Sequence, residues 1–202
     1  MLSRVFVTFE GLDGSGTTTQ AELLRQHLEE AGRDVVLTRE PGGTELGERI
    51  RELVLGGPEI SPWAEAALFA AARAELVAEV IQPALERGAD VVCDRYLDSS
   101  LAYQGIARGL GVDRVLALNV NAIRGILPDV TFLLLVDPEE AQRRSGPPGD
   151  RIEREGDEFL REVDKAYREL GSAFAGRITM LDASASADEV AKEVRDRLPG
   201  LS

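Results

Sequence analysis

Residues 5–20 read VFVTFEGLDGSGTTTQ, a short apolar run followed by a glycine-rich turn and the start of an amphipathic stretch. Gly11 and Gly16 stand five residues apart, as in the phosphate-binding pattern G-x-x-x-x-G-K-[ST]. In that pattern the loop's backbone N–H groups turn inward around an anion at the N-terminus of the next helix. The stretch therefore predicts a strand, a phosphate-binding loop and a helix. The expected loop residues are Gly11, Leu12, Asp13, Gly14, Ser15, Gly16, Thr17, Thr18 and Thr19.

Thr17 occupies the position where the pattern has lysine, while Thr18 stands where a hydroxyl would bind Mg²⁺. The chain has only two lysines, Lys165 and Lys192, so a substitute cation near the loop is expected to be an arginine. Losing one preorganised charge-stabilising donor typically lowers turnover by ~10²–10³. The loop by itself is compatible with a working site, a weakened site or an ordinary glycine-rich turn.

Outside this stretch, apolar runs alternate with helical patterns, which predicts one α/β domain over residues 1–202 with a parallel sheet covered by helices. The expected strands are Val5–Phe9, Val35–Thr38, Asp90–Cys93, Thr131–Val136 and Ile178–Leu181. The expected helices are Thr18–Ala31, Glu45–Leu55, Pro62–Arg87, Asp113–Gly125, Pro138–Arg144, Asp157–Ser172 and Ala187–Leu198. Residues 145–150, SGPPGD, form a turn-rich break flanked by arginines and suggest a short lid at about 143–157.

The formal net charge of −13 argues against broad binding to nucleic acid or to an anionic membrane surface. One cysteine excludes an internal disulfide and fits a reducing compartment. The sequence shows no secretory signal pattern and no apolar run of membrane-spanning length, so a cytoplasmic protein is expected.

Asp94 and Arg95 follow directly after the apolar run ending at Cys93, so both are predicted at the carboxyl edge of the sheet. Ligands bind at that edge in open parallel sheets. The carboxylate can hold a metal or its water, and the guanidinium can bind a phosphate through two hydrogen bonds.

The blocks FEGLDGSG, TREPGGT, LFAAARAELV, DRYLDSSLAYQG and PDVTFLLLVDPEEA occur in this order and together resemble thymidylate kinase. The resemblance runs from about Val5 to Asp182, and DRY followed by SSLAYQG is its most specific part. It implies a P-loop nucleoside-monophosphate kinase fold with five parallel strands, and transfer of a phosphoryl group from ATP to dTMP with Mg²⁺. It also implies a homodimer.

Site roles follow from the same resemblance. Arg39, Glu40 and Pro41 would border the acceptor nucleotide; Phe69 would stack on thymine and Arg73 would hydrogen-bond the base, four residues apart on one helix face. Arg95 would hold the acceptor phosphate, with Asp13 near it. Thr18 and Asp94 would bind the metal ion. Ser99, Ser100, Tyr103 and Gln104 would line the sugar and base, and residues 181–184 (LDAS) would pass beside the donor's adenine.

Some thymidylate kinases carry an arginine inside the phosphate loop, whereas this chain has Gly14 and resembles the bacterial type that supplies basic residues from the lid. Arg151 is the expected catalytic lid residue, and Arg143 an expected donor-binding residue. Two alternatives stay open: a kinase for another deoxynucleoside monophosphate, and a nucleotide-binding protein whose catalysis decayed with the lysine.

Overall fold

The computed structural model describes residues 4–147 and 149–198, and its centre is a sheet of five parallel strands in the order β2-β3-β1-β4-β5. The strands are β1 (Phe6–Gly11), β2 (Val35–Arg39), β3 (Asp90–Asp94), β4 (Val130–Leu135) and β5 (Ile178–Asp182). All five coincide with the predicted strands to within two residues at each end, which confirms the predicted fold class.

Strand register brings the ends of β1, β2 and β3 together. Phe9 and Arg39 both pair with Asp94, and Gly11 pairs with Leu134 of β4. Because all strands are parallel, the residues that follow them emerge at one edge of the sheet. The segments after Gly11, Arg39 and Asp94 are therefore neighbours in space although they are far apart in the sequence.

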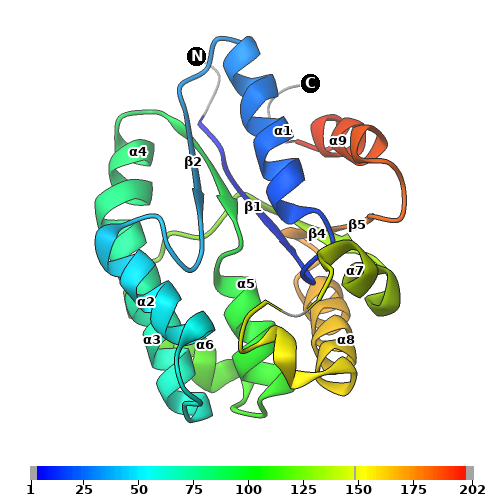
Figure 1. Cartoon of the computed structure of the whole chain (residues 1–202). Helices are drawn as coiled ribbons and strands as arrows, with labels where there is room; N and C mark the ends of the chain where they lie inside the picture. Colours follow the sequence, from blue (N-terminus) through cyan, green and yellow to red (C-terminus); the bar gives the residue numbers. More distant parts are fainter. Residues whose placement is uncertain (1–3, 148, 199–202) are drawn as a thin grey trace.

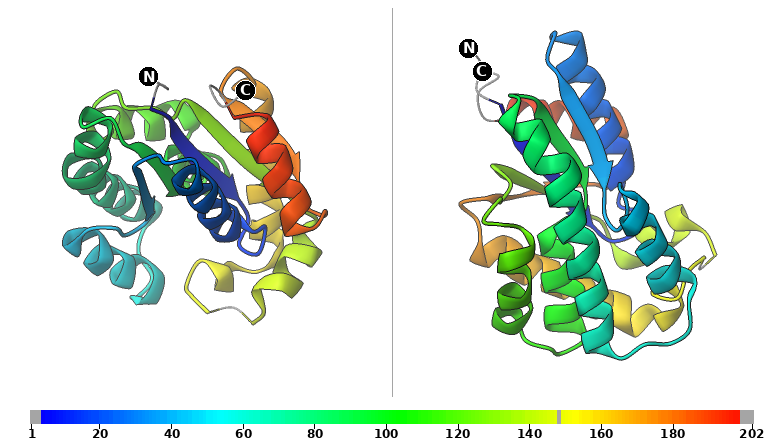
Figure 2. Two further views of the ribbon diagram at one scale, coloured as in Figure 1. Left: turned by 90° about the horizontal axis from the view of Figure 1, so that it is seen from above. Right: turned by 90° about the vertical axis from the view of Figure 1, so that its left-hand side faces the viewer.

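Helices cover both faces of the sheet (Figures 1 and 2). Helices α1 and α9 pack together on one face, while α4, α5 and α8 contact strands from the other. The α-helices are α1 (Thr17–Glu30), α2 (Glu45–Gly56), α3 (Pro62–Leu76), α4 (Gln82–Glu86), α5 (Leu97–Ser100), α6 (Val112–Ala122), α7 (Pro138–Ser145), α8 (Asp157–Ala173) and α9 (Ala187–Asp196). Three further turns are π-helical η1 (Val77–Ile81), π-helical η2 (Leu101–Ala107) and 3₁₀ η3 (Glu153–Glu155).

The core lies between the sheet and these helices. Phe9 of β1 stacks on Phe132 of β4 with ring centroids 5.6 Å apart, and both side chains are fully buried. Strands β1 and β3 are buried along their whole length, whereas the two edge strands are partly exposed: β2 has only half-buried and exposed residues, and in β5 only Ile178 and Leu181 are buried.

The sequence predicted no helix for residues 97–107, where the structure has α5 and η2. Leu101, Ala102, Tyr103, Gln104 and Gly105 are all buried, so this segment lacks the alternation of apolar and polar residues that marks a surface helix. The single helix expected over Pro62–Arg87 is divided into α3, η1 and α4.

Residues 149–156, which lead into α8, are drawn in yellow in Figure 1 and reach the end of α2. The Arg151 backbone N–H donates to the Leu55 carbonyl at 2.8 Å, which fastens the segment to the end of α2. Across the described residues, no helix is both long enough and apolar enough to pass through a bilayer.

Candidate functional site

The loop between β1 and α1 has the conformation expected of an anion-binding turn. Gly14 and Gly16 have φ of 82° and 99°, values that suit glycine far better than other residues. A Cβ atom at Gly14 would lie 2.1 Å from the Ala141 carbonyl oxygen of α7. Close packing against α7 therefore leaves no space for a side chain at position 14.

A pocket opens around this loop, and Thr17 lines it although its side chain is mostly buried. Because Thr17 faces this pocket, a lysine there would direct its ammonium group into the pocket. Four arginines share the lining and are the candidate cations of this pocket: Arg39, Arg51, Arg95 and Arg144. The remaining lining residues are Asp13, Gly14, Ser15, Gly16, Thr18, Thr19, Gln20, Glu40, Asp94, Ala183, Ala185, Ala187 and Val190.

Thr18 and Asp94 meet in this pocket. The Thr18 hydroxyl donates to Asp94 Oδ2 at 2.5 Å, while Asp94 Oδ1 is buried and has no hydrogen-bond partner among the described residues. An unpartnered carboxylate oxygen beside a hydroxyl suits Mg²⁺, which binds through one or two carboxylates and completes its shell with waters and substrate phosphates. Within the described residues, no three His, Cys, Asp or Glu side chains form a metal site by themselves.

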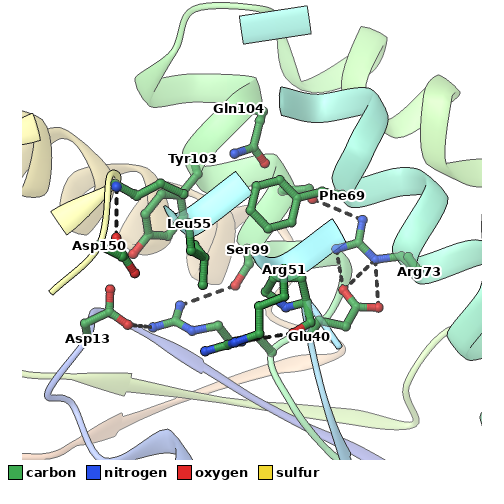
Figure 3. Close-up of a pocket in the computed structure, with 14 residues that line it drawn as sticks. Asp13, Glu40, Arg51, Leu55, Phe69, Arg73, Ser99, Tyr103, Gln104 and Asp150 are labelled. Atoms are coloured by element: carbon green, nitrogen blue, oxygen red, sulfur yellow. Dashed lines mark hydrogen bonds and ion pairs between the residues drawn. The ribbon is translucent and has the colours of Figure 1, made fainter. Parts of the chain in front are cut away.

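A second pocket adjoins the first and brings together most of the predicted acceptor residues (Figure 3). In Figure 3 the Phe69 ring and Gln104 lie on its upper side, and Asp13 and Glu40 lie on its lower side. The full lining is Asp13, Glu40, Pro41, Arg51, Leu55, Phe69, Arg73, Arg95, Ser99, Ser100, Tyr103, Gln104, Asp150 and Ile152. Arg51, Leu55, Asp150 and Ile152 were not among the residues predicted from the sequence.

The two pockets share a wall made of Asp13, Glu40, Arg51 and Arg95. Arg51 of α2 donates from Nη1 to the Pro41 carbonyl at 2.9 Å, which fixes the helix against the loop after β2. Two arginines, Arg51 and Arg95, thus stand at the junction of the two pockets.

Arg95 is held by contacts from three directions. Its Nη2 donates to Asp13 Oδ1 at 2.7 Å, and its Nη1 donates to the Gly11 carbonyl at 2.7 Å and the Tyr167 hydroxyl at 3.2 Å. Its φ of 68° lies in the left-handed region, which is rare for a residue with a Cβ and concentrates at functional sites. The backbone conformation and these side-chain contacts together hold the Arg95 guanidinium in the wall that the two pockets share.

Arg73 lines the second pocket, but its five N–H groups already donate hydrogen bonds within the protein. They donate to both Glu40 carboxylate oxygens, Ser100 Oγ, Asn119 Oδ1 and the Tyr96 carbonyl, at 2.5–3.1 Å. A hydrogen bond from Arg73 to a base would have to replace one of these bonds. In this structure its guanidinium holds the Glu40 loop against α5 and α6.

Glu10 and Tyr167 belong to the site's support, and the sequence reasoning missed both. Glu10 Oε2 accepts from Ser99 Oγ at 2.5 Å and from the Tyr167 hydroxyl at 3.1 Å, and both hydroxyls lie within reach of Arg95 Nη1. Burial, with Asp98 adding negative charge nearby, raises the pKa of Glu10 to about 7. The only signal for Glu10 in the sequence was its place directly after the predicted strand Val5–Phe9 and before Gly11.

The lid arginines are placed unevenly. Arg151 is buried and donates from Nη2 to Glu65 Oε2 at 2.5 Å, and it does not line the pocket around the glycine-rich loop. Arg143 is exposed and paired with Glu140. Its neighbour Arg144 does line that pocket and donates to the Ala183 carbonyl at 2.8 Å, within the LDAS segment.

Comparison with known proteins agrees with this geometry. A model of the thymidylate kinase family matches residues 9–194. A thymidylate kinase of Bifidobacterium longum (strain NCC 2705) is 49% identical over 194 residues, covering 94% of each chain. One from Pelotomaculum thermopropionicum is 50% identical over 184 residues, covering 89% of this chain and 85% of that protein.

The crystal structure of thymidylate kinase from Ehrlichia chaffeensis superimposes with a TM-score of 0.80 at 33% identity, covering 95% of this chain and 96% of the other. With the family match spanning most of the chain, the relationship is one of family and not of fold alone. The chain belongs to the thymidylate kinase family, whose members are phosphotransferases that convert dTMP to dTDP.

Proposed function

We propose that this chain transfers the γ-phosphoryl group of ATP to dTMP, with ATP in the pocket around the glycine-rich loop (the donor pocket) and dTMP in the adjoining pocket (the acceptor pocket). The observation that carries the proposal is the shared wall of Asp13, Glu40, Arg51 and Arg95. Phosphoryl transfer needs two nucleotides held with their phosphates in line, and positive charge between them. The wall offers two arginines at that junction.

On the donor side, backbone N–H groups of the glycine-rich loop and of the first turn of α1 would bind the ATP phosphates. Thr18 and Asp94 would hold Mg²⁺, which neutralises phosphate charge when bound. Arg144, through its contact with the LDAS segment, is better placed than Arg143 to meet the rest of the donor. Binding of the donor by Arg143 stays a prediction.

On the acceptor side, Phe69 would stack on thymine and Gln104 would meet the edge of the base, with Ser99, Ser100 and Tyr103 along the sugar. Arg95 would bind the acceptor phosphate while Asp13 orients the guanidinium. Arg39 and Pro41 would border the nucleotide. Arg73 would form one wall mainly by holding Glu40.

Residues 143–157 would act as a lid. Asp150 and Ile152 line the acceptor pocket, so this segment already covers part of it. Arg151 reaches the transferred phosphate only if it leaves Glu65, so its catalytic role would require the lid to move.

Thr17→Lys tests whether the missing lysine of the glycine-rich loop limits catalysis. The lysine would enter the donor pocket that Thr17 lines. One restored charge is expected to raise kcat for dTMP at least about tenfold, equivalent to ~1.4 kcal/mol of barrier. The measurement is steady-state phosphorylation of dTMP by the wild type and the variant.

Gln26→Lys is the matched control, because it adds the same charge at an exposed position of α1 and should leave kcat unchanged. Equal kcat for the wild type and Thr17→Lys would show that position 17 is not limiting. Tight dTMP binding by calorimetry with negligible turnover would favour a binding protein. A monophosphate that outcompetes dTMP would instead identify another kinase.

We also propose a homodimer, on the strength of the family relationship alone. Light scattering of the purified protein tests it, and a mass of one 21.9 kDa chain at assay concentrations would contradict it.

A further inference from the structure

Glu65 of α3 is a buried carboxylate without a proposed role in substrate binding or catalysis. It is 1% exposed and accepts hydrogen bonds from three residues of distant segments. Gln104 Nε2 donates to Oε1 at 2.9 Å, and Arg151 Nη2 donates to Oε2 at 2.5 Å. Arg108 donates to both oxygens at 3.2–3.3 Å. The carboxylate thus joins the lid segment to the residue beside the proposed base position.

The charge on Glu65 decides which way the Gln104 amide faces. Burial alone would raise the pKa of Glu65, but hydrogen bonds from Arg151, Gln104 and Arg108 outweigh it and hold the pKa below its ordinary value. An ionised carboxylate only accepts hydrogen bonds, so it must face the NH₂ end of the amide. The Gln104 carbonyl oxygen then points away from Glu65.

That carbonyl oxygen accepts no hydrogen bond from any described residue, and Gln104 lines the acceptor pocket. Figure 3 places the Gln104 side chain at the upper side of the pocket, on the side where the Phe69 ring also lies, and both residues line it. A base stacked on Phe69 would therefore meet an acceptor at its edge. Thymine and uracil carry a donor, N3–H, at that edge, whereas cytosine carries an acceptor at N3.

We propose that Glu65 is a positioning residue for base selection: it fixes the Gln104 amide so that its oxygen accepts from thymine N3–H and opposes the cytosine N3 lone pair. The inference rests on the proposed function, since it needs the acceptor base against Phe69. Through Arg151, the same carboxylate ties this orientation to the docked position of the lid. Selection arises because a wrong base leaves two acceptors facing each other in a buried site.

Glu65→Gln provides the first test, because an amide at position 65 can both donate and accept and so no longer dictates how Gln104 faces. The measurement is kcat/KM for dTMP, dUMP and dCMP. We expect the dTMP:dCMP ratio to fall at least about tenfold, the scale of one misplaced hydrogen bond. The dTMP:dUMP ratio should change less than about twofold, because uracil presents the same N3–H and that ratio reports only the methyl group.

Two further variants separate positioning from general damage. Asp90→Asn is the matched control: Asp90 is a buried carboxylate paired with Arg33 at the opposite edge of the sheet, so both ratios should stay at wild-type values. In a Gln104→Met background, adding Glu65→Gln should have no further effect on the dTMP:dCMP ratio. An unchanged ratio in Glu65→Gln, or an equal fall in Asp90→Asn, would overturn the proposal.

Should Glu65→Gln fail to fold, the wild type supplies the decisive measurement. In NMR spectra, the Gln104 side-chain amide protons should stay protected by their hydrogen bond to Glu65 when dTMP binds. A bound state in which the amide donates to the base instead of to Glu65 would refute the proposal. If the wild type does not phosphorylate dTMP, the proposed function fails first. The dTMP:dCMP ratio of Kd, measured by calorimetry in the wild type and Glu65→Gln, then tests the positioning role separately.

Discussion

At the scale of single residues, Glu10 is a carboxyl whose buried environment raises its pKa to about 7. Its pKa of about 7 comes first from burial and then from the charge of Asp98, against lowering contacts from Ser99, Arg95 and the Tyr96 N–H. Other titratable groups that sense it are Arg73, Cys93, Tyr103, Tyr167 and Arg177. Since the ordinary pKa of a glutamate is 4.5, the folded chain binds a proton between these values that the unfolded chain releases.

This difference makes Glu10 a source of pH-dependent stability. A raised carboxyl pKa stabilises the folded state fully below pH 4.5 and loses that contribution as pH rises towards 7. Compared with Glu10→Gln, the wild type should lose on the order of 3 kcal/mol of unfolding free energy across that window. Urea titrations of both proteins from pH 4.5 to 7.5 measure the difference, and parallel pH curves would contradict it.

At the scale of elements, the packing of the glycine-rich loop on α7 links the donor pocket to the lid. Gly14→Ala would place a methyl group against the Ala141 carbonyl, so loop or helix must shift. We expect a higher KM for ATP, because α7 carries Arg144 into the donor pocket, and a loss of stability of about 1–3 kcal/mol.

Gly32→Ala is the control for this prediction. Gly32 has φ of 78°, close to the 82° of Gly14, but a Cβ there would meet nothing within 4 Å. Both variants place an alanine at a similar positive φ, but only Gly14→Ala sets its methyl group against α7. The same KM for ATP in both would argue against a role for that contact, and steady-state kinetics decides.

At the scale of the whole molecule, the acceptor pocket gathers residues of α2, α3, η2 and the lid around one ligand, so dTMP should stabilise the fold. At one hundred times its Kd, dTMP should add ~2.7 kcal/mol to the free energy of unfolding. For a chain of this size that corresponds to a rise in Tm of roughly 5–10 °C. Scanning calorimetry with dTMP and with dCMP at equal concentration measures it, and equal shifts for both would contradict the proposed selectivity.

The elements predicted from the sequence can also be compared with those of the structure. Strands β1 to β5 were predicted because buried parallel strands are continuous apolar runs bounded by turns. The segment 97–107 was missed because most of its residues are buried, so it lacks the amphipathic pattern of a surface helix. Most acceptor residues were named through the family resemblance, whereas Arg51 stood in a charged helix with no feature that separates it from solvated arginines.

By itself, the sequence determined the α/β sheet, the loop after β1, and the emergence of Asp94 and Arg95 at the sheet's edge, because these depend on local patterns of burial and turn formation. Only the tertiary structure decided which charged groups meet. Glu65 reaches Gln104 across 39 positions and Arg151 across 86. Such contacts depend on how helices and loops pack, and local sequence patterns do not predict this packing. The same reason explains why Arg151 lies on Glu65 and Arg144 beside the loop that lacks a lysine.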